Sequence, residues 1–273
     1  MSASPLLCPR PRVGIVGFGA FGRLIAEHLA PHADLTVYDP QRPVRPPPYV
    51  VVGDLPEVAA CPVVILATPV ARLAEVVGAL EPLLRPGTLV VDVGSVKLRP
   101  AEILREGLPD HVAILATHPL FGPQSAREGI RGLKIAVCPI RGRPGRRAAA
   151  FLRRGLGLDV ILTTPEAHDR AMASVQGLTH LIAKVLVAME PLPTRMTTRS
   201  FDLLMQAVGM VRHDAPEVFH AIERENPYAV PVRRRFFALA EQLDAELSAR
   251  GERADRPSPA LAPVRHRAVS PAA

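Results

Sequence analysis

The sequence contains no tryptophan, and aromatic residues make up only 4% of its 273 residues. Only three of its 33 basic residues are lysines, so the formal net charge of +7 comes mostly from arginine. A nucleic-acid-binding surface would typically interleave basic with aromatic residues or carry zinc-finger or recognition-helix spacing, and the sequence has none of these patterns. We therefore interpret the arginines as a solvated surface that suits small anionic substrates, and we expect no nucleic-acid partner.

Cysteine is also scarce. Cys8, Cys61 and Cys138 stand singly, without a CxxC pair, which argues against a disulfide framework or a zinc site and fits a reducing compartment. The first twelve residues, MSASPLLCPRPR, lack the apolar core of a secretion signal. The longest uncharged apolar stretch, residues 58–71, contains two prolines and is too short to cross a bilayer. We expect a soluble, cytoplasmic protein with no metal site and no membrane contact.

The first half of the chain alternates apolar runs with helix-like segments. Runs that are apolar throughout are typical of strands buried on both faces, as in a parallel sheet flanked by helices. The predicted strands are residues 12–17, 35–38, 63–67, 88–93, 112–116, 133–138 and 159–163, and the predicted helices are 20–30, 70–81, 99–106 and 145–156. The proline-rich segment 40–48 is predicted to be a surface loop. The fold class is therefore α/β, Rossmann-type, with a mostly parallel sheet.

After Thr164 the strand pattern ends. Pro165 suits the first turn of a long helix that Pro191 and Pro193 end, and further helices are predicted at about 199–211, 215–225 and 231–249. The predicted domains are a nucleotide-binding domain at 1–163 and a helical domain at 164–249. The tail, residues 250–273, is rich in Pro, Arg and Ala and is predicted to be disordered.

A glycine pattern follows the first predicted strand and opens a helix. Gly17, Gly19 and Gly22 form GxGxxG, in which the first glycine allows a tight turn, the second admits a pyrophosphate and the third permits close packing. Asp39 ends the second strand, 20 residues after Gly19, where an acid would bind the adenosine ribose. Its charge favours NAD over NADP, although Arg42 nearby could accept the extra phosphate of NADP. The other residues expected to contact the cofactor are Phe18, Ala20, Phe21 and Thr68.

Two loops at the carboxyl ends of strands carry the polar residues that oxidation of an alcohol requires. In THPLFGP (117–123), His118 is followed by two prolines and a glycine, and it is the candidate acceptor for a hydroxyl proton near neutral pH. In DVGSVK (92–97), Ser95 can orient His118 or the substrate hydroxyl, or cap the helix that follows it. Lys97 brings positive charge for anions. Hydride transfer to a nicotinamide completes such a reaction.

These segments resemble the TyrA family of prephenate and arogenate dehydrogenases. The resemblance covers about residues 12 to 245 and rests on GFGAFG (17–22), DVGSVK (92–97), THPLFGPQSA (117–126) and HDRAMASVQGLTH (168–180). It implies oxidative decarboxylation of prephenate or arogenate, with His118 as the catalytic base and Ser95 as its partner. It also implies a homodimer formed through the helical domain, and the remaining length fits no regulatory or chorismate mutase domain.

The predicted helix from Pro165 carries a polar face. Met172, Gln176 and His180 are spaced by four residues, with Asp169 close to the same line. From the residues alone this face could be a satisfied polar core or a pocket wall. The resemblance implies that His180 binds substrate and that Gln176 shares its face. His168 falls about 100° off that face, so we interpret it as a structural residue of the first turn, together with Asp169.

The sequence departs from the family where an arginine binds the substrate carboxylate, because Met210 stands at that position. Arg212, Arg195 or Arg199 could supply the charge instead. Arogenate carries an ammonium group where prephenate carries a keto group, so an acid such as Asp214 would favour arogenate. The sequence leaves the two substrates open.

Parts of the sequence are compatible with two other functions. A β-hydroxyacid dehydrogenase would carry GxxGxxxKxxxN on the long helix. Gly177 and Lys184 fit that pattern, but His180 and Ala188 do not. A non-enzymatic nucleotide- or nucleic-acid-binding protein would not need Ser95 and His118, and both are present.

Overall fold

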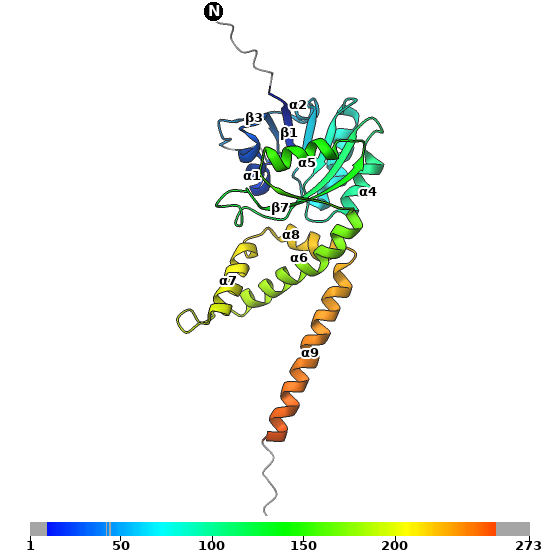
Figure 1. The fold of residues 1–273 in the computed structure, drawn as a ribbon. Helices are drawn as coiled ribbons and strands as arrows, with labels where there is room; N and C mark the ends of the chain where they lie inside the picture. Colours follow the sequence, from blue (N-terminus) through cyan, green and yellow to red (C-terminus); the bar gives the residue numbers. More distant parts are fainter. Residues whose placement is uncertain (1–9, 42, 44, 255–273) are drawn as a thin grey trace, which may run out of the picture. The chain divides into compact units, whose positions relative to one another are not determined.

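The computed structural model describes residues 10–41, 43 and 45–254. Eight strands form one sheet in the order β3-β2-β1-β4-β5-β6-β7-β8 (Figure 1). The strands are β1 (Arg12–Val16), β2 (Asp34–Tyr38), β3 (Val50–Val52), β4 (Val63–Leu66), β5 (Leu89–Asp92), β6 (Ala113–Pro119), β7 (Lys134–Arg141) and β8 (Asp159–Leu162). All neighbouring strands pair in parallel except β6 and β7, which are antiparallel.

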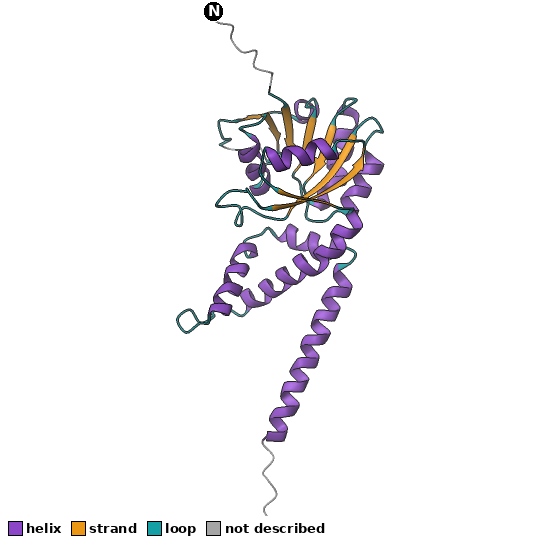
Figure 2. Cartoon of the chain, in the orientation of Figure 1, coloured by secondary structure: helices purple, strands orange, loops and turns teal. Residues whose placement is uncertain are grey.

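Helices cover the sheet (Figure 2), and among the described residues no strand follows β8. Those within the sheet domain are α1 (Ala20–Leu29), α2 (Leu55–Ala59), α3 (Leu73–Leu80), α4 (Leu98–Gly107) and α5 (Gly145–Arg154), with 3₁₀ turns η1 (Val70–Arg72) and η2 (Glu81–Leu83) at the two ends of α3. This arrangement confirms the predicted α/β, Rossmann-type fold class. The order of strands reverses between β1 and β4, which is where a sheet of this kind binds its ligand, outside the carboxyl ends of the strands.

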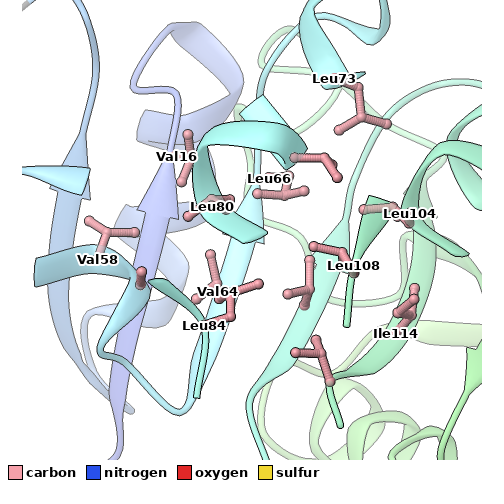
Figure 3. Close-up of a cluster of buried hydrophobic side chains, with 14 residues drawn as sticks. Val16, Val58, Val64, Leu66, Leu73, Leu80, Leu84, Leu104, Leu108 and Ile114 are labelled. Carbon is pink, nitrogen blue, oxygen red and sulfur yellow. The ribbon is translucent and has the colours of Figure 1, made fainter. Parts of the chain in front are cut away.

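The continuous apolar runs are explained by burial on both faces of the sheet. In β4, Val64 and Leu66 belong to the hydrophobic cluster on one face, and Ile65 belongs to the cluster on the other. Figure 3 shows the first cluster, in which Leu80 and Leu104 pack near the strand residues Leu66 and Ile114. Because neither face of the central strands meets water, no polar alternation appears in their sequence.

The segment between β2 and β4 contains two short elements that the sequence analysis missed. Strand β3 pairs with β2, and the five-residue helix α2 begins after Asp54. The Asp54 side chain accepts a hydrogen bond from Glu57 N, while the Glu57 side chain accepts one from Asp54 N, which makes a capping box. Each element spans too few residues for hydrophobic periodicity to reveal it. Of the proline-rich segment, the described residues form loop and turn as expected, and Arg42 lies outside the described residues.

The predicted end of the strand at residues 112–116 was wrong. Strand β6 continues past Ala116 to Pro119, so His118 lies in the strand and not in a following loop. His118 pairs with Ala136 of the antiparallel neighbour β7. The backbone of His118 is therefore held by pairing with β7, and also by the prolines that follow it.

The chain after β8 is helical, as predicted. Its elements are α6 (Pro165–Ala188), α7 (Arg199–Val211), α8 (Pro216–His220), the π-helical turn η3 (Ala221–Glu225) and α9 (Ala229–Ala254). The described residues through Arg233 belong to one compact unit with the sheet, and the rest of α9 belongs to a second. The tail was predicted to be disordered from residue 250, but α9 continues to Ala254, and residues 255–273 lie outside the described residues.

By length and composition, α6 is apolar enough to cross a membrane. It nevertheless carries buried His168, Asp169 and His180. All three hydrogen-bond to other parts of the protein, so these polar side chains are paired within the fold.

Candidate active site

The glycine loop after β1 lies at the point where the strand order reverses. Gly17 has a φ of +95°, and a Cβ there would lie 2.5 Å from the carbonyl oxygen of Ala67. A Cβ on Gly22 would lie 2.2 Å from the carbonyl oxygen of Gly17. Gly19 is different, because no atom of the described residues lies within 4 Å of its Cβ position. The protein's own packing therefore requires the first and third glycines, whereas Gly19 leaves open the approach to the N-terminus of α1.

The acidic residue at the end of β2 faces this loop. Asp39 Oδ2 accepts a hydrogen bond from Phe18 N at 2.6 Å, and Oδ1 accepts one from Gln41 N at 2.8 Å. Phe18 belongs to the glycine loop. Its side chain is buried in the core, and its backbone N–H is the group that meets Asp39. Ala20 and Phe21 begin α1. After β4, Thr68 has a buried hydroxyl oxygen without a hydrogen-bond partner among the described residues.

The candidate base is buried at the carboxyl end of β6. His118 is only 4% exposed, and its Nδ1 lies 2.8 Å from Nε2 of His168. His168 Nδ1 lies 2.7 Å from Oδ1 of Asp169. Burial holds the pKa of His118 well below its usual value, and nearby His168 and Lys97 lower it further. His118 is therefore neutral at physiological pH, as a proton acceptor must be.

Asp169 connects α6 to the start of α4. Its Oδ1 accepts a hydrogen bond from Lys97 N at 2.8 Å, and its Oδ2 accepts one from Leu98 N at 2.9 Å. These are N–H groups that the first turn of a helix leaves without intrahelical partners. Asn226 also donates a hydrogen bond to the backbone oxygen of Asp169. Asp169 is thus held beside His168 through both its carboxylate and its backbone oxygen.

The expected role of Lys97 does not fit its position. Its side chain is completely buried and forms an ion pair with Asp92, and Nζ also donates to Thr117 O at 2.7 Å. An ammonium group held in this way ties β5 to β6 beneath the site and is not presented to an incoming anion. Sequence reasoning missed this role, because a motif does not reveal which way a lysine side chain turns.

Ser95 lies in the loop between β5 and α4 and is half-buried. The N-cap position of α4 belongs to Lys97, and no side chain caps the helix from there. The alternative that Ser95 caps the helix is therefore wrong, and its hydroxyl is not committed to that bond.

His180 lies three turns along α6 from His168 and bonds on both sides of its ring. Nδ1 lies 2.9 Å from the backbone oxygen of Gln176, and Nε2 lies 3.2 Å from Oδ2 of Asp214. Both neighbours are acceptors, so each ring nitrogen of His180 faces an oxygen atom of the protein. A Cβ on Gly122, in the loop after His118, would lie 3.9 Å from Asp214 Oδ1. The loop after β6 therefore reaches the His180–Asp214 pair.

The remaining candidates for the substrate carboxylate are on the surface. Arg212 forms an ion pair with Glu190 at 3.0 Å, and Arg195, Arg199 and Met210 are exposed. The amide oxygen of Gln176 is buried without a hydrogen-bond partner among the described residues. Lys184, which the hydroxyacid dehydrogenase alternative requires, is exposed, with its Nζ 5.6 Å from the centre of the Phe219 ring.

Family models match both halves of the chain. Residues 49–139 match the nucleotide-binding domain of prephenate dehydrogenase, and residues 164–256 match its dimerization domain. The chain belongs to the prephenate dehydrogenase family. The first family match begins after the glycine loop, so it is independent of that motif.

Relatives of this prephenate dehydrogenase family member occur in a plant, in bacteria and in an archaeon. Chloroplastic arogenate dehydrogenase 1 of Arabidopsis thaliana is 28% identical over 261 residues, which cover 88% of this chain and 40% of the plant protein. The 4-amino-4-deoxyprephenate dehydrogenase of Streptomyces pristinaespiralis is 31% identical, covering 64% of this chain and 60% of that protein. The chain thus spans less than two thirds of either relative.

A solved structure shares the fold. The prephenate dehydrogenase of A. aeolicus, in complex with hydroxyphenyl propionate and NAD⁺, superposes with a TM-score of 0.67 at 20% identity. The match covers 90% of this chain and 93% of the other.

Replacing Lys97 by Met tests whether this lysine stabilises the fold. The change leaves Asp92 charged and buried without its partner, so we expect the free energy of unfolding to fall by about 3–5 kcal/mol. Urea unfolding followed by circular dichroism measures the loss. The control is Lys134→Met at an exposed position, for which we expect a change within about 0.5 kcal/mol. A Lys97→Met protein as stable as the control would show that the ion pair is not structural.

Proposed function

We propose that the protein is an NAD-dependent dehydrogenase that oxidises and decarboxylates arogenate or prephenate, the reaction that yields tyrosine or 4-hydroxyphenylpyruvate. The observation that carries this proposal is the position of His118, a buried neutral imidazole at the carboxyl end of a strand. Its Nδ1 is bonded to His168, so Nε2 is the nitrogen left to accept a proton. Membership of the prephenate dehydrogenase family supports the same reaction.

The residues of the glycine loop fit a dinucleotide. Gly19 admits a phosphate to the N-terminus of α1, where N–H groups and the positive end of the helix dipole favour an anion. Each oxygen of Asp39 accepts one bond from the protein and keeps a lone pair for a ribose hydroxyl. The unpartnered hydroxyl of Thr68 fits a hydrogen bond to the same ligand. The charge of Asp39 opposes a 2′-phosphate, which favours NAD over NADP.

The proposed chemistry balances with the cofactor as the oxidant. NAD supplies the acceptor for the hydride that leaves the carbinol carbon of the ring. His118 Nε2 accepts the proton of the ring hydroxyl, and Ser95 orients that hydroxyl. The bond to the ring carboxylate breaks, carbon dioxide leaves and its electron pair completes the aromatic ring. The proton held by His118 then passes to the product oxygen or to solvent. Because aromatisation drives the reaction, the protein mainly has to position the groups.

His180 and Asp214 are the residues proposed to bind the charged groups of the substrate. We assign His180 and Gln176 to the substrate pocket because the family resemblance implies a role for His180 there and because the buried amide oxygen of Gln176 has no hydrogen-bond partner among the described residues. Asp214 is about a quarter exposed, and its Oδ1 lies near Gly122 of the loop that follows His118. A carboxylate there attracts the ammonium of arogenate and offers nothing to the keto group of prephenate. We therefore favour arogenate as the preferred substrate.

A homodimer is part of the proposal. Residues 164–256 match a dimerization domain, and large apolar side chains are exposed on α6 and α7. They are Val175, Val185, Leu203, Leu204 and Met210. A second copy of the chain covering these side chains would remove them from water.

The first experiment measures NAD reduction by the purified protein with arogenate and with prephenate, using NADP as a control. We expect turnover with NAD. In His118→Asn we expect kcat to fall by about 10²–10⁴-fold, the usual contribution of a general base, with NAD affinity retained. Absence of turnover with both substrates, despite NAD binding, would contradict the proposed function.

The pH dependence of kcat/KM tests the state of His118. Because the pKa of His118 lies well below 6.5, the base stays unprotonated as the pH falls from 8 to 6.5. We expect the loss of activity due to His118 protonation to begin only below pH 6.5. Stopped assays across this range in buffers of constant ionic strength measure it. A decline centred between pH 6.5 and 7.5, with the protein still folded, would contradict this assignment.

Two glycine variants separate folding from cofactor binding. Gly22→Ala forces a Cβ against the backbone of Gly17, so we expect the free energy of unfolding to fall by about 1–3 kcal/mol. Gly19→Ala meets no protein atom within 4 Å, so we expect nearly normal stability with NAD binding weakened at least tenfold. Thermal unfolding and calorimetric titration with NAD measure the two effects. Unchanged NAD affinity in Gly19→Ala would rule out a pyrophosphate at this loop.

Substrate choice is tested with Asp214→Asn. Removing the negative charge should lower kcat/KM for arogenate. The ratio of kcat/KM for prephenate to kcat/KM for arogenate should therefore rise by at least about tenfold, equivalent to about 1.4 kcal/mol. Steady-state kinetics with both substrates measure the ratio. Asp159→Asn, at the exposed start of β8, is the matched control. An unchanged ratio in Asp214→Asn would rule out this carboxylate as the specificity element.

A further inference from the structure

His118 and Asp169 are connected through the ring of His168. The first bond joins His118 Nδ1 to His168 Nε2 at 2.8 Å, and the second joins His168 Nδ1 to Asp169 Oδ1 at 2.7 Å. His118, His168 and Asp169 are 4%, 3% and 0% exposed, so water does not compete for these bonds. The position of the proton on each of these three groups therefore depends on the position of the proton on its neighbour.

The direction of the bonds follows from Asp169. Both of its oxygens already accept backbone N–H groups at the start of α4, and a carboxylate can accept several such bonds. His168 Nδ1 therefore donates to Asp169. When each of the two imidazoles carries a single proton, His168 has only a lone pair at Nε2, so His118 Nδ1 donates to it. This leaves His118 with an unprotonated Nε2.

We infer that His168 is a positioning residue that, with Asp169, holds His118 in the tautomer whose Nε2 accepts the substrate proton. This inference rests on the proposed function for its meaning in catalysis. It replaces the interpretation of His168 as a structural residue of the first turn alone. The opposite tautomer of His118 would place two lone pairs face to face between the rings.

The same row of bonds serves the charged state. When His118 has accepted a proton, its Nδ1–H still donates to His168, and His168 still donates to the carboxylate of Asp169. The positive charge is thus connected to a negative one through a single ring. In a serine protease, loss of the correct histidine tautomer with the geometry intact lowers kcat by about 10⁴-fold.

Substitutions of His168 can keep or remove a side chain that donates to Asp169 and accepts from His118. In His168→Gln the amide nitrogen can donate to Asp169, and the amide oxygen can accept from His118 Nδ1. In His168→Leu the ring is replaced by an apolar side chain, and His118 loses its acceptor. His111→Leu is the matched control, because His111 is exposed at the far end of β6 from His118.

The experiment measures the tautomer directly and then its effect on rate. Long-range ¹H–¹⁵N correlation spectra of the full-length protein labelled with ¹⁵N-histidine report which ring nitrogen of His118 carries the proton. The His118 signals are assigned with His118→Asn, and the spectra need neither substrate nor cofactor. We expect Nδ1–H with an unprotonated Nε2 in the wild type and in His168→Gln, and a mixture in His168→Leu.

Kinetics supply the second measurement. We expect kcat to fall at least about 100-fold in His168→Leu, by less than about tenfold in His168→Gln and not at all in His111→Leu, with the KM for substrate nearly constant. A protonated Nε2 on His118 in the wild type would overturn the inference, as would an undiminished kcat in His168→Leu. Absence of turnover by the wild type would instead refute the proposed function, while the spectra still decide the tautomer.

Discussion

The position of the site depends on the carboxylate of Asp169. This one side chain binds the first backbone N–H groups of α4 and the ring of His168, so it connects the sheet domain to the long helix α6. A helix begins with N–H groups that lack partners, and a buried helix start must find acceptors elsewhere. Here the acceptor comes from 72 residues further along the chain. The bond that completes α4 is therefore also the bond that places His168 against His118.

A buried ion pair lies next to this connection. Asp92 at the end of β5 and Lys97 at the start of α4 are both shielded from water, and Lys97 also reaches the carbonyl of Thr117. Such a pair costs desolvation, so it adds little net stability, but its members cannot be separated without a large penalty. It fixes the carboxyl ends of β5 and β6 relative to each other, one residue before His118. The ion pair and the pairing of β6 with β7 together fix the backbone of His118 at the carboxyl end of β6.

Much of the fold could be predicted from local patterns. Strands buried on both faces appear as unbroken apolar runs, and β1, β2, β4, β5 and β8 lie close to their predicted ranges, whereas β7 continues to Arg141, past its predicted end at residue 138. Helix α6 was apparent from Pro165 at its start and the prolines beyond its end. The short elements β3 and α2 were missed because three to five residues carry no measurable period. The predicted strand at residues 112–116 is too short because THP has the composition of a turn. Pairing with β7 nevertheless extends β6 through these three residues.

The sequence by itself determined the Rossmann-type order of elements, the glycine loop with Asp39, and His118 as the candidate base, because each depends on residues close together in the chain. Tertiary structure alone decided the roles of His168, Asp169 and Lys97. His168 falls off the polar face of its own helix by periodicity, yet it meets a histidine 50 residues away. Lys97 turns inward to Asp92 although its motif suggested an exposed charge. These contacts join segments distant in sequence, and which side chains meet there depends on how α4, α6 and the sheet pack.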